Sequence, residues 1–427
     1  MNRKVLMLAH AYPPYNSMGA LRAAKFAKYL PKYGWEPIVV TRIWPEEMGG
    51  LEEPAEIRVI RTDYHDRLGI FRHSYPSKVK APSRGSQASG WRSKLRRIAS
   101  FWVKELLAYP DEFVGWKPYA VEVARKILKK EDIAIIFSTS PPPTSHLIAH
   151  ELQRESSLPW VADFRDLWTQ NHYIRHTRPR QWLEARLERR VLKNASVLVT
   201  VSHPMAEKLK WLHKKPVEVI TNGYDEDDYA GPPPPLTPYF SITYTGQLYA
   251  GKRDPSLLFA AVRKLLDDRI IDPQSFRIRF YGPERDGEVI LSLAARYGIE
   301  RVVGHYGRVS YQEAILHQRE STILLLLNWL SAKERGVYTG KLFEYLGAKR
   351  PILAIPRIEG VVDDLLRETG AGVVAGTVDE IVQLIKLWHN EFQKTGMVSY
   401  RGKDEVIAKY TRAAQTRKLA RIFEQLR

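Results

Sequence analysis

The sequence predicts an α/β fold built from two doubly wound parallel sheets, and three observations support this prediction. Short apolar segments alternate with amphipathic segments in both halves of the chain, as in parallel sheets with crossover helices. A chain of 427 residues exceeds the size at which one hydrophobic core usually stops growing. A segment with four consecutive prolines, DYAGPPPPLTPYF, lies between the halves and suits a semi-rigid connector.

These observations divide the chain into four parts. We expect a first domain over residues 1–229, a connector over 230–240, a second domain over 241–403, and one amphipathic helix over 404–427. If the two domains face each other, the carboxyl ends of their strands meet at a cleft, where ligands bind in this fold class. We therefore look for functional residues in the loops that follow strands.

The first half begins with a strand, KVLMLA, followed by a helix, GALRAAKFAKYLPKYG. Short apolar segments continue the strand series with EPIVVT, IRVIR, IAIIFST, WVADFRD and SVLVTVS. The second half repeats the scheme with FSITYTG, FRIRFYG, RVVGHYG, STILLLL, RPILAIP and GAGVVAG. Helices are expected between these strands, among them 255–268, 311–319 and 339–348, the last with Thr339 as its N-cap.

Composition limits the classes of function. The absence of cysteine excludes disulfides, thiolate metal sites and cysteine nucleophiles, and it fits a reducing compartment. The longest apolar run, STILLLLNWL, falls short of the roughly 20 residues that cross a bilayer. The formal net charge of +18 predicts an anionic partner. We expect a cytoplasmic protein that can lie peripherally on the inner face of a membrane.

The densest basic stretch spans residues 72–109 and ends in WRSKLRRIASFWVKELLAY. Its apolar residues recur at helical spacing with basic residues among them: Trp91, Leu95, Ile98, Trp102, Leu106 and Tyr109. A basic amphipathic helix with tryptophans suits an anionic membrane surface. A helix that packs its apolar stripe on its own domain fits the pattern as well, so both interpretations stay open.

Two loops carry candidates for anion binding. Gly19 lies at the start of the first helix, where unpaired backbone N–H groups favour an anion, but no dinucleotide fingerprint surrounds it. Lys252 and Arg253 stand just before the helix expected at 255–268, so two cations and a helix N-terminus can converge on a phosphate. The Walker pattern fails, because Leu342 follows Lys341 and no glycine precedes it at the required spacing.

The first half also offers candidates for acid-base chemistry. Asp166 follows the strand WVADFRD, and His146 lies near a helix start after IAIIFST, so both can serve an acceptor hydroxyl. The alternative is that His146 packs in the core and that Asp163 and Arg165 form a structural pair. No His-x-x-x-His pattern accompanies these residues, and we interpret Asp225-Glu226-Asp227 as surface charge, so we expect no metal site.

Glu344 is the one acid in the segment GVYTGKLFEYLGAKRPILAIP. On the helix expected at 339–348, its neighbours three and four residues away are small or basic: Gly340, Lys341, Gly347 and Ala348. Glycine inside a helix costs about 1 kcal/mol relative to alanine, so two of them beside a carboxylate indicate that a ligand comes close. A solvated helix face with glycines at its ends is the alternative.

The order and spacing of these loops resemble the retaining glycosyltransferases of family 4, which have the GT-B fold of two Rossmann-like domains. YPPYNSMGALRAAKFAKYL is similar to the family's N-terminal glycine loop, and SVLVTVSHPMAEKL and VEVITNGYD to the end of its first domain. ITYTGQLYAGKRDPSLLFAAV, FRIRFYGPE, RVVGHYGRVSYQEAI and GKLFEYLGAKRPILA resemble successive elements of its donor domain. The resemblance covers nearly the whole chain.

The resemblance implies roles for particular residues. Lys252 and Arg253 match the cations that hold the donor diphosphate, and Glu344 matches the acid that binds the donor ribose hydroxyls. The backbone of 339–341, with Thr339, Gly340 and Lys341, is implied near the diphosphate. The glycine loops are implied around the donor, with Gly246 after the first strand of the second half and with Gly282, Tyr306, Gly307 and Arg308 flanking the base. The C-terminal helix is implied to cross back to the first domain.

The chain departs from the family's pattern at two positions. The family has a second glutamate eight positions before the one matched by Glu344, and this position is Gly336 here. Glu334 can replace it only through a shift of the loop. The position after Gly246, often basic in the family, is Gln247, so phosphate binding rests more heavily on Lys252 and Arg253.

The resemblance implies a retaining glycosyltransferase that uses a nucleoside-diphosphate-sugar, UDP- or GDP-linked, without a further cofactor or a metal. A lipid-linked or glycan acceptor in cell-surface polysaccharide or glycolipid synthesis is the expected partner. A sugar-nucleotide epimerase or a pseudo-glycosyltransferase coupling enzyme is the alternative that shares the fold. A nucleic-acid-binding protein is disfavoured, because the basic residues are dispersed over both halves.

Overall fold

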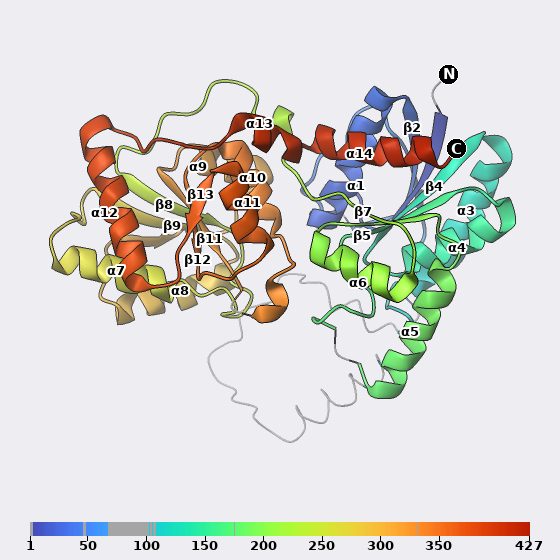
Figure 1. The fold of residues 1–427 in the computed structure, drawn as a ribbon, viewed down its shortest axis with the longest axis horizontal. Coiled ribbons are helices and arrows are strands. Elements are labelled where there is room, and N and C mark those ends of the chain that lie inside the picture. The colour runs from blue at the N-terminus through green and yellow to red at the C-terminus, as the bar shows by residue number, and fades with distance from the viewer. Residues whose placement is uncertain are drawn as a thin grey trace. The chain divides into compact units, whose positions relative to one another are not determined.

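The structure, a computed structural model, describes residues 3–45, 48–66, 102, 105, 108–174, 176–329 and 331–427. The chain divides into two compact units, each built on its own sheet (Figure 1). The first unit comprises Met1–Ile220 and Thr416–Arg427, and the second comprises Thr221–Gln415. Residues 221–229, which we assigned to the first domain, therefore belong to the second unit.

The first unit contains a parallel seven-stranded sheet in the order β3-β2-β1-β4-β5-β6-β7. Its strands are β1 (Arg3–Ala9), β2 (Trp35–Arg42), β3 (Arg58–Thr62), β4 (Ile133–Ser140), β5 (Trp160–Phe164), β6 (Val197–Thr200) and β7 (Val217–Val219). The three-residue strand β7 is too short to produce a periodic signal, and the sequence did not predict it. The other six strands lie where apolar segments predicted them.

Alternate residues of β1 face opposite sides of the first sheet, because side chains alternate along a strand. Val5 and Met7 pack with α1 (Met18–Tyr29), whereas Leu6 and Leu8 pack with α3 (Lys117–Lys130) and α4 (Thr144–Ser156). The second side is also covered by α5 (Arg178–Leu192) and α6 (His203–His213). Helices on both sides leave the carboxyl ends of the strands as the accessible edge for chemistry.

The second unit contains a parallel six-stranded sheet in the order β10-β9-β8-β11-β12-β13. Its strands are β8 (Phe240–Thr245), β9 (Phe276–Tyr281), β10 (Val303–His305), β11 (Ile323–Leu327), β12 (Ile352–Ile355) and β13 (Gly372–Val374). Each lies within an apolar segment that predicted a strand. The strand order reverses between β8 and β11, and α/β sheets bind ligands at such a point.

Helices cover both sides of the second sheet. One side packs against α7 (Ser256–Asp267), α8 (Glu284–Arg296) and α12 (Val378–Thr395). The other packs against α10 (Gly340–Ala348) and α11 (Val361–Thr369), while α9 (Tyr311–Arg319) contacts β8 and α10. α9 begins with a capping box between Ser310 and Glu313, and its bounds agree with the prediction.

The C-terminal segment is not one helix, as we expected for 404–427, but three pieces: α13 (Asp404–Ile407), η7 (Ala408–Tyr410) and α14 (Arg412–Gln425). The chain leaves the helix at Thr411 because its backbone pairs with Tyr224 instead, and the Arg412 N–H donates to the Tyr224 carbonyl at 2.7 Å. The end of α14 then packs in the first unit, where the ring centroids of Phe423 and Trp35 lie 5.2 Å apart. The predicted return to the first domain is confirmed.

Two further sequence-based expectations are affected by the structure. Asp225 is buried and accepts a hydrogen bond from the Asp227 N–H at the start of η5 (Glu226–Tyr229), so the interpretation as surface charge was wrong for this residue. The stretch 72–109 and the helix predicted near its end lie outside the described residues, apart from 102, 105, 108 and 109. Among the described helices, none combines the length and the hydropathy that a membrane span requires.

Candidate functional site

Three glycines at the carboxyl ends of adjacent strands bring their backbones into contact in the second unit. Gly246 follows β8, Gly282 follows β9, and Gly307 lies just beyond β10. The Gly246 N–H donates to the Tyr281 carbonyl at 2.6 Å, and the Gly282 N–H donates to the Gly307 carbonyl at 2.9 Å. A Cβ atom on Gly282 would lie 2.4 Å from the Gly246 carbonyl oxygen, so a side chain there would force these loops apart.

Arg253 places a buried guanidinium group beside this glycine edge. Its Nη1 donates to the Tyr244 hydroxyl at 3.2 Å, and its guanidinium lies 4.7 Å from the centre of the Tyr249 ring. The backbone that carries it is tightly turned, since Tyr249, Ala250 and Gly251 all have positive φ angles of 53°, 54° and 82°. The sequence predicted Arg253 beside a helix N-terminus, and the structure places it just before α7.

Lys341 adds a second cation at the same edge. Its Nζ would lie only 2.2 Å from a Cβ atom on Gly246, so the glycine, with φ of 144°, leaves the space that the ammonium group occupies. The ammonium lies 5.7 Å from the centre of the ring of Tyr244, the residue whose hydroxyl accepts the hydrogen bond from Arg253. Burial and the neighbouring Arg253 charge lower the pKa of Lys341 to about 7, although Glu344 opposes them.

Lys252 makes different contacts from these two cations. Its side chain is exposed, and its Nζ lies over the Trp329 ring at 4.3 Å from the centre. Trp329 in turn stacks on Tyr249, with ring centroids 5.8 Å apart. The loop after β8 therefore carries one buried cation, Arg253, and one surface cation held on an aromatic face.

Glu344 is held by a residue from a different helix. The Gln318 Nε2 atom on α9 donates to the Glu344 Oε2 atom at 3.2 Å and to the Thr245 hydroxyl at 3.0 Å. The Thr245 N–H donates to the Tyr345 hydroxyl at 3.2 Å, which fixes α10 to the end of β8. Burial raises the pKa of Glu344, while Lys341 and Gln318 act in the opposite direction. The carboxylate thus stands near Lys341 at the end of β8.

The glycines beside Glu344 do not share one role. A Cβ atom on Gly347 would lie 2.6 Å from the Tyr229 ring and 2.8 Å from the Tyr224 ring, so two tyrosines of the protein fill that space. The expectation that Gly347 leaves room for a ligand was therefore wrong. Gly340 begins α10 after Thr339, which occupies the N-cap position as predicted, although its hydroxyl makes no capping hydrogen bond.

Three buried polar side chains around this edge are incompletely paired. Within the described ranges, the Nε atom of Arg253, the Oε1 atom of Gln318 and the hydroxyl of Thr339 are buried without a hydrogen-bond partner. Buried polar atoms are rarely left unpaired in proteins, because each costs free energy. Donors and acceptors of this kind, beside two cations and a carboxylate, suit a ligand that carries both phosphate and hydroxyl groups.

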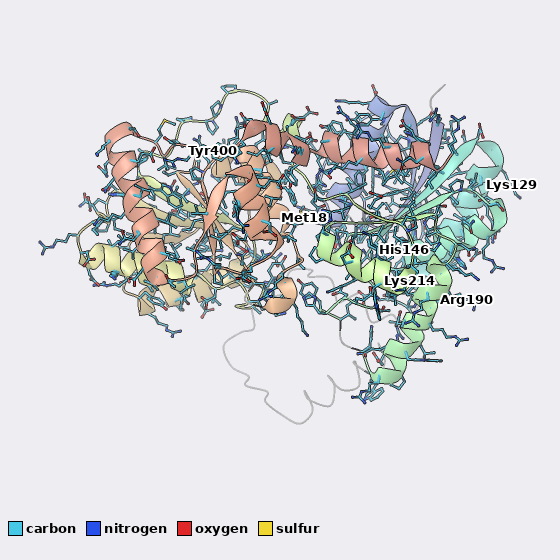
Figure 2. All side chains as sticks on the ribbon, in the orientation of Figure 1. Met18, Lys129, His146, Arg190, Lys214 and Tyr400 are labelled. Carbon is cyan, nitrogen blue, oxygen red and sulfur yellow. The ribbon has the colours of Figure 1, made fainter. Side chains whose placement is uncertain are left out.

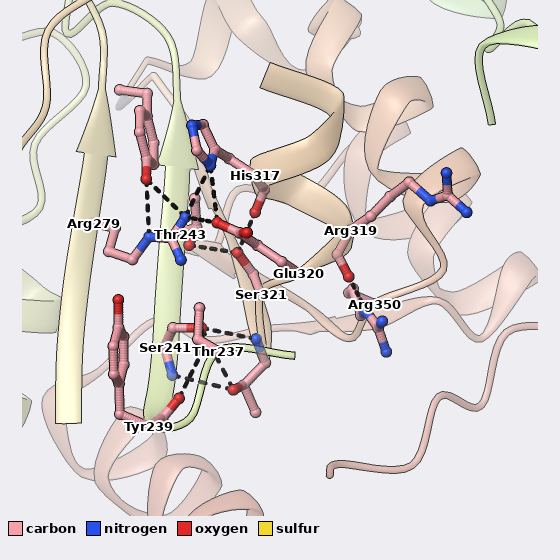
Figure 3. A network of polar contacts seen from close by, with 12 residues as sticks. Thr237, Tyr239, Ser241, Thr243, Arg279, His317, Arg319, Glu320, Ser321 and Arg350 are labelled. Atoms are coloured by element: carbon pink, nitrogen blue, oxygen red, sulfur yellow. Dashed lines mark hydrogen bonds and ion pairs between the residues drawn. The ribbon is translucent and has the colours of Figure 1, made fainter. Parts of the chain in front are cut away.

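Aromatic rings continue the edge beyond β9. Tyr306 is half-exposed and stacks on Tyr281 at 5.2 Å between ring centroids, and Tyr281 stacks on His317 at 4.1 Å. Figure 3 shows a polar network next to His317, in which the Arg279 guanidinium hydrogen-bonds to His317 and Glu320 at the C-terminal end of α9. This network holds α9 against β9 and so fixes the helix that presents Gln318. Arg308 is exposed beside the stack, at Gly307.

In the first unit, Gly19 and Asp166 are joined by Arg165. A Cβ atom on Gly19 would lie 2.1 Å from the Arg165 Nη1 atom, so a side chain there would displace this guanidinium from the start of α1. The Nη2 atom of Arg165 lies 3.3 Å from the Asp166 Oδ2 atom, and both side chains are partly exposed. Arg165, which we had considered only as a structural partner of Asp163, thus completes this set.

His146 is fully buried, and both of its ring nitrogens are occupied. Figure 2 labels His146 in the first unit. Its Nδ1 atom lies 2.8 Å from the Ser138 hydroxyl and its Nε2 atom lies 2.9 Å from the Ser140 hydroxyl, and burial lowers the pKa of His146 to about 3. The prediction that His146 serves an acceptor was therefore wrong, and the packing alternative holds. A buried, neutral imidazole with two partners has no free position for a substrate.

Asp163 is also structural, but its partner differs from the one we considered. Arg22 on α1 grips it with two hydrogen bonds, from Nη2 to Oδ1 at 2.7 Å and from Nε to Oδ2 at 3.0 Å. The Thr139 hydroxyl donates to Oδ2 at 2.7 Å, and Arg22 also donates to the Ile220 carbonyl at 2.9 Å. Both side chains are fully buried, so this pair joins α1, β4 and β5 inside the first unit.

Sequence reasoning missed Gln318 and the side-chain role of Lys341. Gln318 lies on the buried side of α9 with Ile315, and a polar residue at an apolar position of a helix is the signal that identifies it. Lys341 was considered for its backbone N–H group alone. In the residues that the structure describes, no three His, Cys, Asp or Glu side chains gather as a metal site would require.

Comparisons with known proteins agree with this architecture. The family model described as Glycosyltransferase Family 4 matches residues 20–228. A search of the curated proteins found no match to the sequence. The family match lies almost entirely in the first unit, whereas the cations and Glu344 lie in the second.

Solved structures match over the whole length of the chain. Sucrose-phosphate synthase from Thermosynechococcus elongatus superposes with a TM-score of 0.63 at 14% identity, covering 99% of both chains. Anabaena HepE in complex with UDP and glucose gives 0.61 at 13% identity, covering 99% of this chain and 100% of its own. The lipopolysaccharide outer core galactosyltransferase WaaB gives 0.55 at 14% identity, covering 99% of both.

At these identities the structural likeness establishes the fold alone. The predicted GT-B fold is confirmed, and residues 20–228 match the model of the family that the sequence resembles. The protein has the fold of the GT-B glycosyltransferases, and its residues 20–228 match glycosyltransferase family 4.

Proposed function

We propose that this protein is a retaining glycosyltransferase, which moves a sugar from a nucleoside-diphosphate-sugar to an acceptor hydroxyl. The observation that carries the proposal is the convergence of Arg253, Lys341 and the Gln318–Glu344 pair at the glycine edge of the second unit. Two cations suit a diphosphate, and a carboxylate accepts hydrogen bonds from two adjacent ribose hydroxyls. HepE, a structural neighbour, was solved with UDP and with UDP-glucose.

The chemical task of the site is to stabilise the leaving diphosphate. Negative charge grows on its oxygens as the glycosidic bond breaks, and cations fixed in advance lower the energy of that transition state. Arg253 is already oriented by Tyr244, and Lys341 is held at Gly246, so neither group has to reorganise during the reaction. The backbone N–H groups at the start of α10 also stabilise the leaving diphosphate in this proposal. The proposal requires no metal or other cofactor.

Lys341 also compensates for the missing cation at position 247, where the family's pattern often has a basic residue and this chain has Gln247. The Lys341 ammonium reaches Gly246, the residue next to Gln247, from a helix that lies almost one hundred positions later in the chain. We infer that Lys341 supplies the cation that position 247 lacks. Lys252 then serves the outer phosphate or remains on Trp329.

The other predicted donor contacts follow the same edge. Gly246, Gly282 and Gly307 allow the donor to approach the backbone, and Thr339 and Gly340 face the diphosphate at the start of α10. The Tyr306 and Arg308 loop flanks the base, which we propose is uracil or guanine. Gly336 offers no carboxylate at the position of the family's second glutamate, so we propose that the sugar is transferred on its front face without a protein nucleophile.

The acceptor is proposed to bind the first unit near Asp166 and Arg165, beside the amide groups at Gly19. The net charge of +18 supports a lipid-linked or glycan acceptor of a cell-surface polysaccharide or glycolipid, met at the cytoplasmic face of a membrane. A role for the basic stretch 72–109 in that contact remains a proposal.

Product analysis tests the function. The purified protein is incubated with UDP- and GDP-sugars, with and without a membrane extract that contains lipid-linked acceptors. The products are identified by mass spectrometry, and the stereochemistry of their sugars is assigned by NMR. We expect a glycosylated product and nucleoside diphosphate only when acceptor is present, and the product should carry the anomeric configuration of the donor. An inverted linkage would overturn retention, and an altered donor sugar without acceptor would overturn transfer.

An epimerase is the second candidate. A putative UDP-N-acetylglucosamine 2-epimerase from Listeria monocytogenes shares the fold, with a TM-score of 0.54 at 13% identity over 100% of this chain and 96% of its own. The absence of a carboxylate at Gly336 is the feature that keeps this candidate open. Conversion of the donor sugar without acceptor, in the experiment above, would establish it.

A further inference from the structure

The outward sides of α5 and α6 in the first unit carry exposed tryptophans among basic residues. Trp182 on α5 is 62% exposed and Trp211 on α6 is 71% exposed, which is unusual for a side chain of this size. Arg186 lies over the Trp182 ring at 5.7 Å, and Lys214 lies over the Trp211 ring at 5.9 Å. We call these four residues, with Arg189 and Lys208, the α5–α6 face.

The two helices pack on the same side of the first sheet and contact each other. Val191 and Leu192 of α5 and Met205 and Leu209 of α6 belong to one core cluster on one side of the first sheet. The helices contact each other where the His213 Nε2 atom lies 3.2 Å from the Glu188 Oε1 atom. The tryptophans lie on the opposite sides of their helices from these buried residues.

The acids of α5 are turned inward, which leaves its outer side basic. Glu184 accepts from the Trp168 Nε1 atom at 2.8 Å and from Arg180, and Glu188 accepts from Thr169 and His213. Both carboxylates are buried. No ion pair joins Arg186, Arg189, Lys208 or Lys214 to a carboxylate in the part of the chain described.

The described end of the basic stretch 72–109 is fixed to the same helix. The Arg180 guanidinium at the start of α5 donates to the carbonyls of Glu105, Ala108 and Pro110. The Tyr109 hydroxyl donates to the Leu183 carbonyl at 3.3 Å. The stretch that the sequence singled out as basic and amphipathic therefore ends beside the α5–α6 face.

We propose that the α5–α6 face docks the first unit on an anionic lipid surface. Indole rings favour the interfacial layer of a bilayer, where the ring is buried and its N–H stays hydrated, and long cationic side chains reach the headgroups around them. Convex helix sides with half-exposed tryptophans suit a flat, deformable partner. The charge of the face is complementary to phosphatidylglycerol or a similar lipid. This proposal does not depend on the reaction that the protein catalyses.

Flotation with vesicles tests the proposal on the full-length protein. The probes are vesicles of phosphatidylcholine alone and vesicles that contain one third phosphatidylglycerol, at low and at high salt. We expect binding to the anionic vesicles only, and its loss when salt rises from about 0.05 M to about 0.5 M, because screening shortens with salt. Equal binding to both vesicle types, or binding to neither, would overturn it.

Matched variants locate the contact. Trp182→Ser with Trp211→Ser should lower the partition coefficient at least tenfold, whereas Leu387→Ser, an equally exposed apolar residue of α12, should leave it unchanged. Arg186→Gln with Arg189→Gln should lower it by about fivefold per charge, and Lys129→Gln with Lys130→Gln on α3 should change it much less. Equal losses in the test and control pairs would overturn the assignment to this face.

Two other occupants are distinguished by further outcomes. If short RNA binds with the same dependence on Trp182 and Trp211 and vesicles do not bind, the face recognises nucleic acid and the lipid proposal is wrong. If the double tryptophan variant changes the molecular mass in solution without lipid, the face joins two copies of the chain. All variants concern exposed side chains, so unchanged melting temperatures serve as the control for folding.

Discussion

Two sets of charged and polar side chains lie near strand ends in the two units, and they differ in how completely they are paired. In the first unit, Arg22 and Asp163 satisfy each other, and the ring nitrogens of His146 meet two serine hydroxyls. In the second unit, Arg253 and Gln318 have buried polar atoms without a hydrogen-bond partner among the described residues. Burial and the neighbouring Arg253 charge also lower the pKa of Lys341.

The difference separates a structural set from a candidate binding set. A buried pair whose members bond to each other contributes its interaction energy to the folded protein. Removing one partner therefore lowers the free energy of unfolding. Polar side chains that are incompletely paired gain partners only when a ligand binds. Removing one of them therefore lowers ligand affinity and turnover. Burial and a perturbed pKa occur in both sets and do not distinguish them.

The largest effect is expected from breaking the satisfied pair. Asp163→Asn removes the carboxylate charge that accepts two hydrogen bonds from the buried Arg22 guanidinium. This breaking of a buried ion pair should lower the free energy of unfolding by about 3–5 kcal/mol. Urea denaturation followed by circular dichroism measures this loss. The double variant Arg22→Met with Asp163→Leu removes both charges and should recover much of it. A loss below about 1 kcal/mol for Asp163→Asn would contradict the structural role.

Arg253→Ala should have the opposite effect, a large loss of turnover with little change in the free energy of unfolding. Removing a preorganised donor from a developing anion typically lowers turnover about 10²–10³-fold, equivalent to about 2.7–4 kcal/mol. The free energy of unfolding should change by less than about 1 kcal/mol, because the Arg253 side chain makes one hydrogen bond to the residues that the structure describes. Steady-state kinetics at saturating acceptor measures the first quantity. Arg263→Ala, on the exposed side of α7, is the matched control.

An unchanged turnover of Arg253→Ala together with a large loss of stability would contradict this division. Arg253 would then resemble Arg22, and the contrast between the two units would fail. A loss of acceptor affinity with normal turnover would likewise remove Arg253 from the leaving-group site.

Lys341 should make donor binding depend on pH. Its pKa of about 7 in the free protein lies below the ordinary value of 10.5, so above pH 7 it is mostly neutral and must take up a proton when a diphosphate binds. Affinity should therefore fall as pH rises from about 7.5 to about 9, by at most tenfold per pH unit, and level off below pH 7. Isothermal titration with a sugar nucleotide measures it.

Lys341→Met should bind the same sugar nucleotide more weakly near pH 7 and with little dependence on pH up to 9. An unchanged pH profile in the variant would show that another group titrates. The free energy of unfolding gives an independent test. Lys341 has a higher pKa in the unfolded chain than in the folded protein, so its contribution to the free energy of unfolding rises with pH between about 7 and 10.5. The variant lacks that rise.

Gln318→Leu is expected to have the smallest effect. It removes the hydrogen bond that orients Glu344, which should weaken donor binding about threefold to tenfold, the equivalent of about 0.5–1.5 kcal/mol. It also removes an amide oxygen that has no partner, so the free energy of unfolding should change little. Calorimetry and urea denaturation measure the two quantities. A loss confined to stability would assign Gln318 to packing alone.

The sequence was sufficient for the described strands other than β7, for the loop that carries Arg253 and for the helix that carries Glu344, because all of these depend on local patterns. Short apolar segments mark buried parallel strands, and loops after them lie at one edge of a sheet. The pairing of Arg22 with Asp163 was beyond reach, since the two residues are 141 positions apart and many acids were available. The same holds for Lys341 and Gly246, which meet only when α10 packs at the end of β8.

His146 shows why a residue type in a promising loop is weak evidence. Its position after β4 and near the start of α4 was predicted, but its side-chain direction depends on Ser138, Ser140 and Phe164, which pack around it. The break at Thr411 had a similar cause, because a pairing with Tyr224 replaced helical hydrogen bonds. Long-range contacts decided both outcomes.

Thermal unfolding with a panel of nucleoside diphosphates tests the assignment of the second unit most directly. A ligand at about 100 times its dissociation constant stabilises by about 2.7 kcal/mol, which is several degrees. We predict stabilisation of the wild-type protein by UDP or GDP, its loss in Glu344→Ala, and its retention in His146→Phe. Equal stabilisation of wild type and Glu344→Ala, or loss in His146→Phe alone, would contradict the assignment.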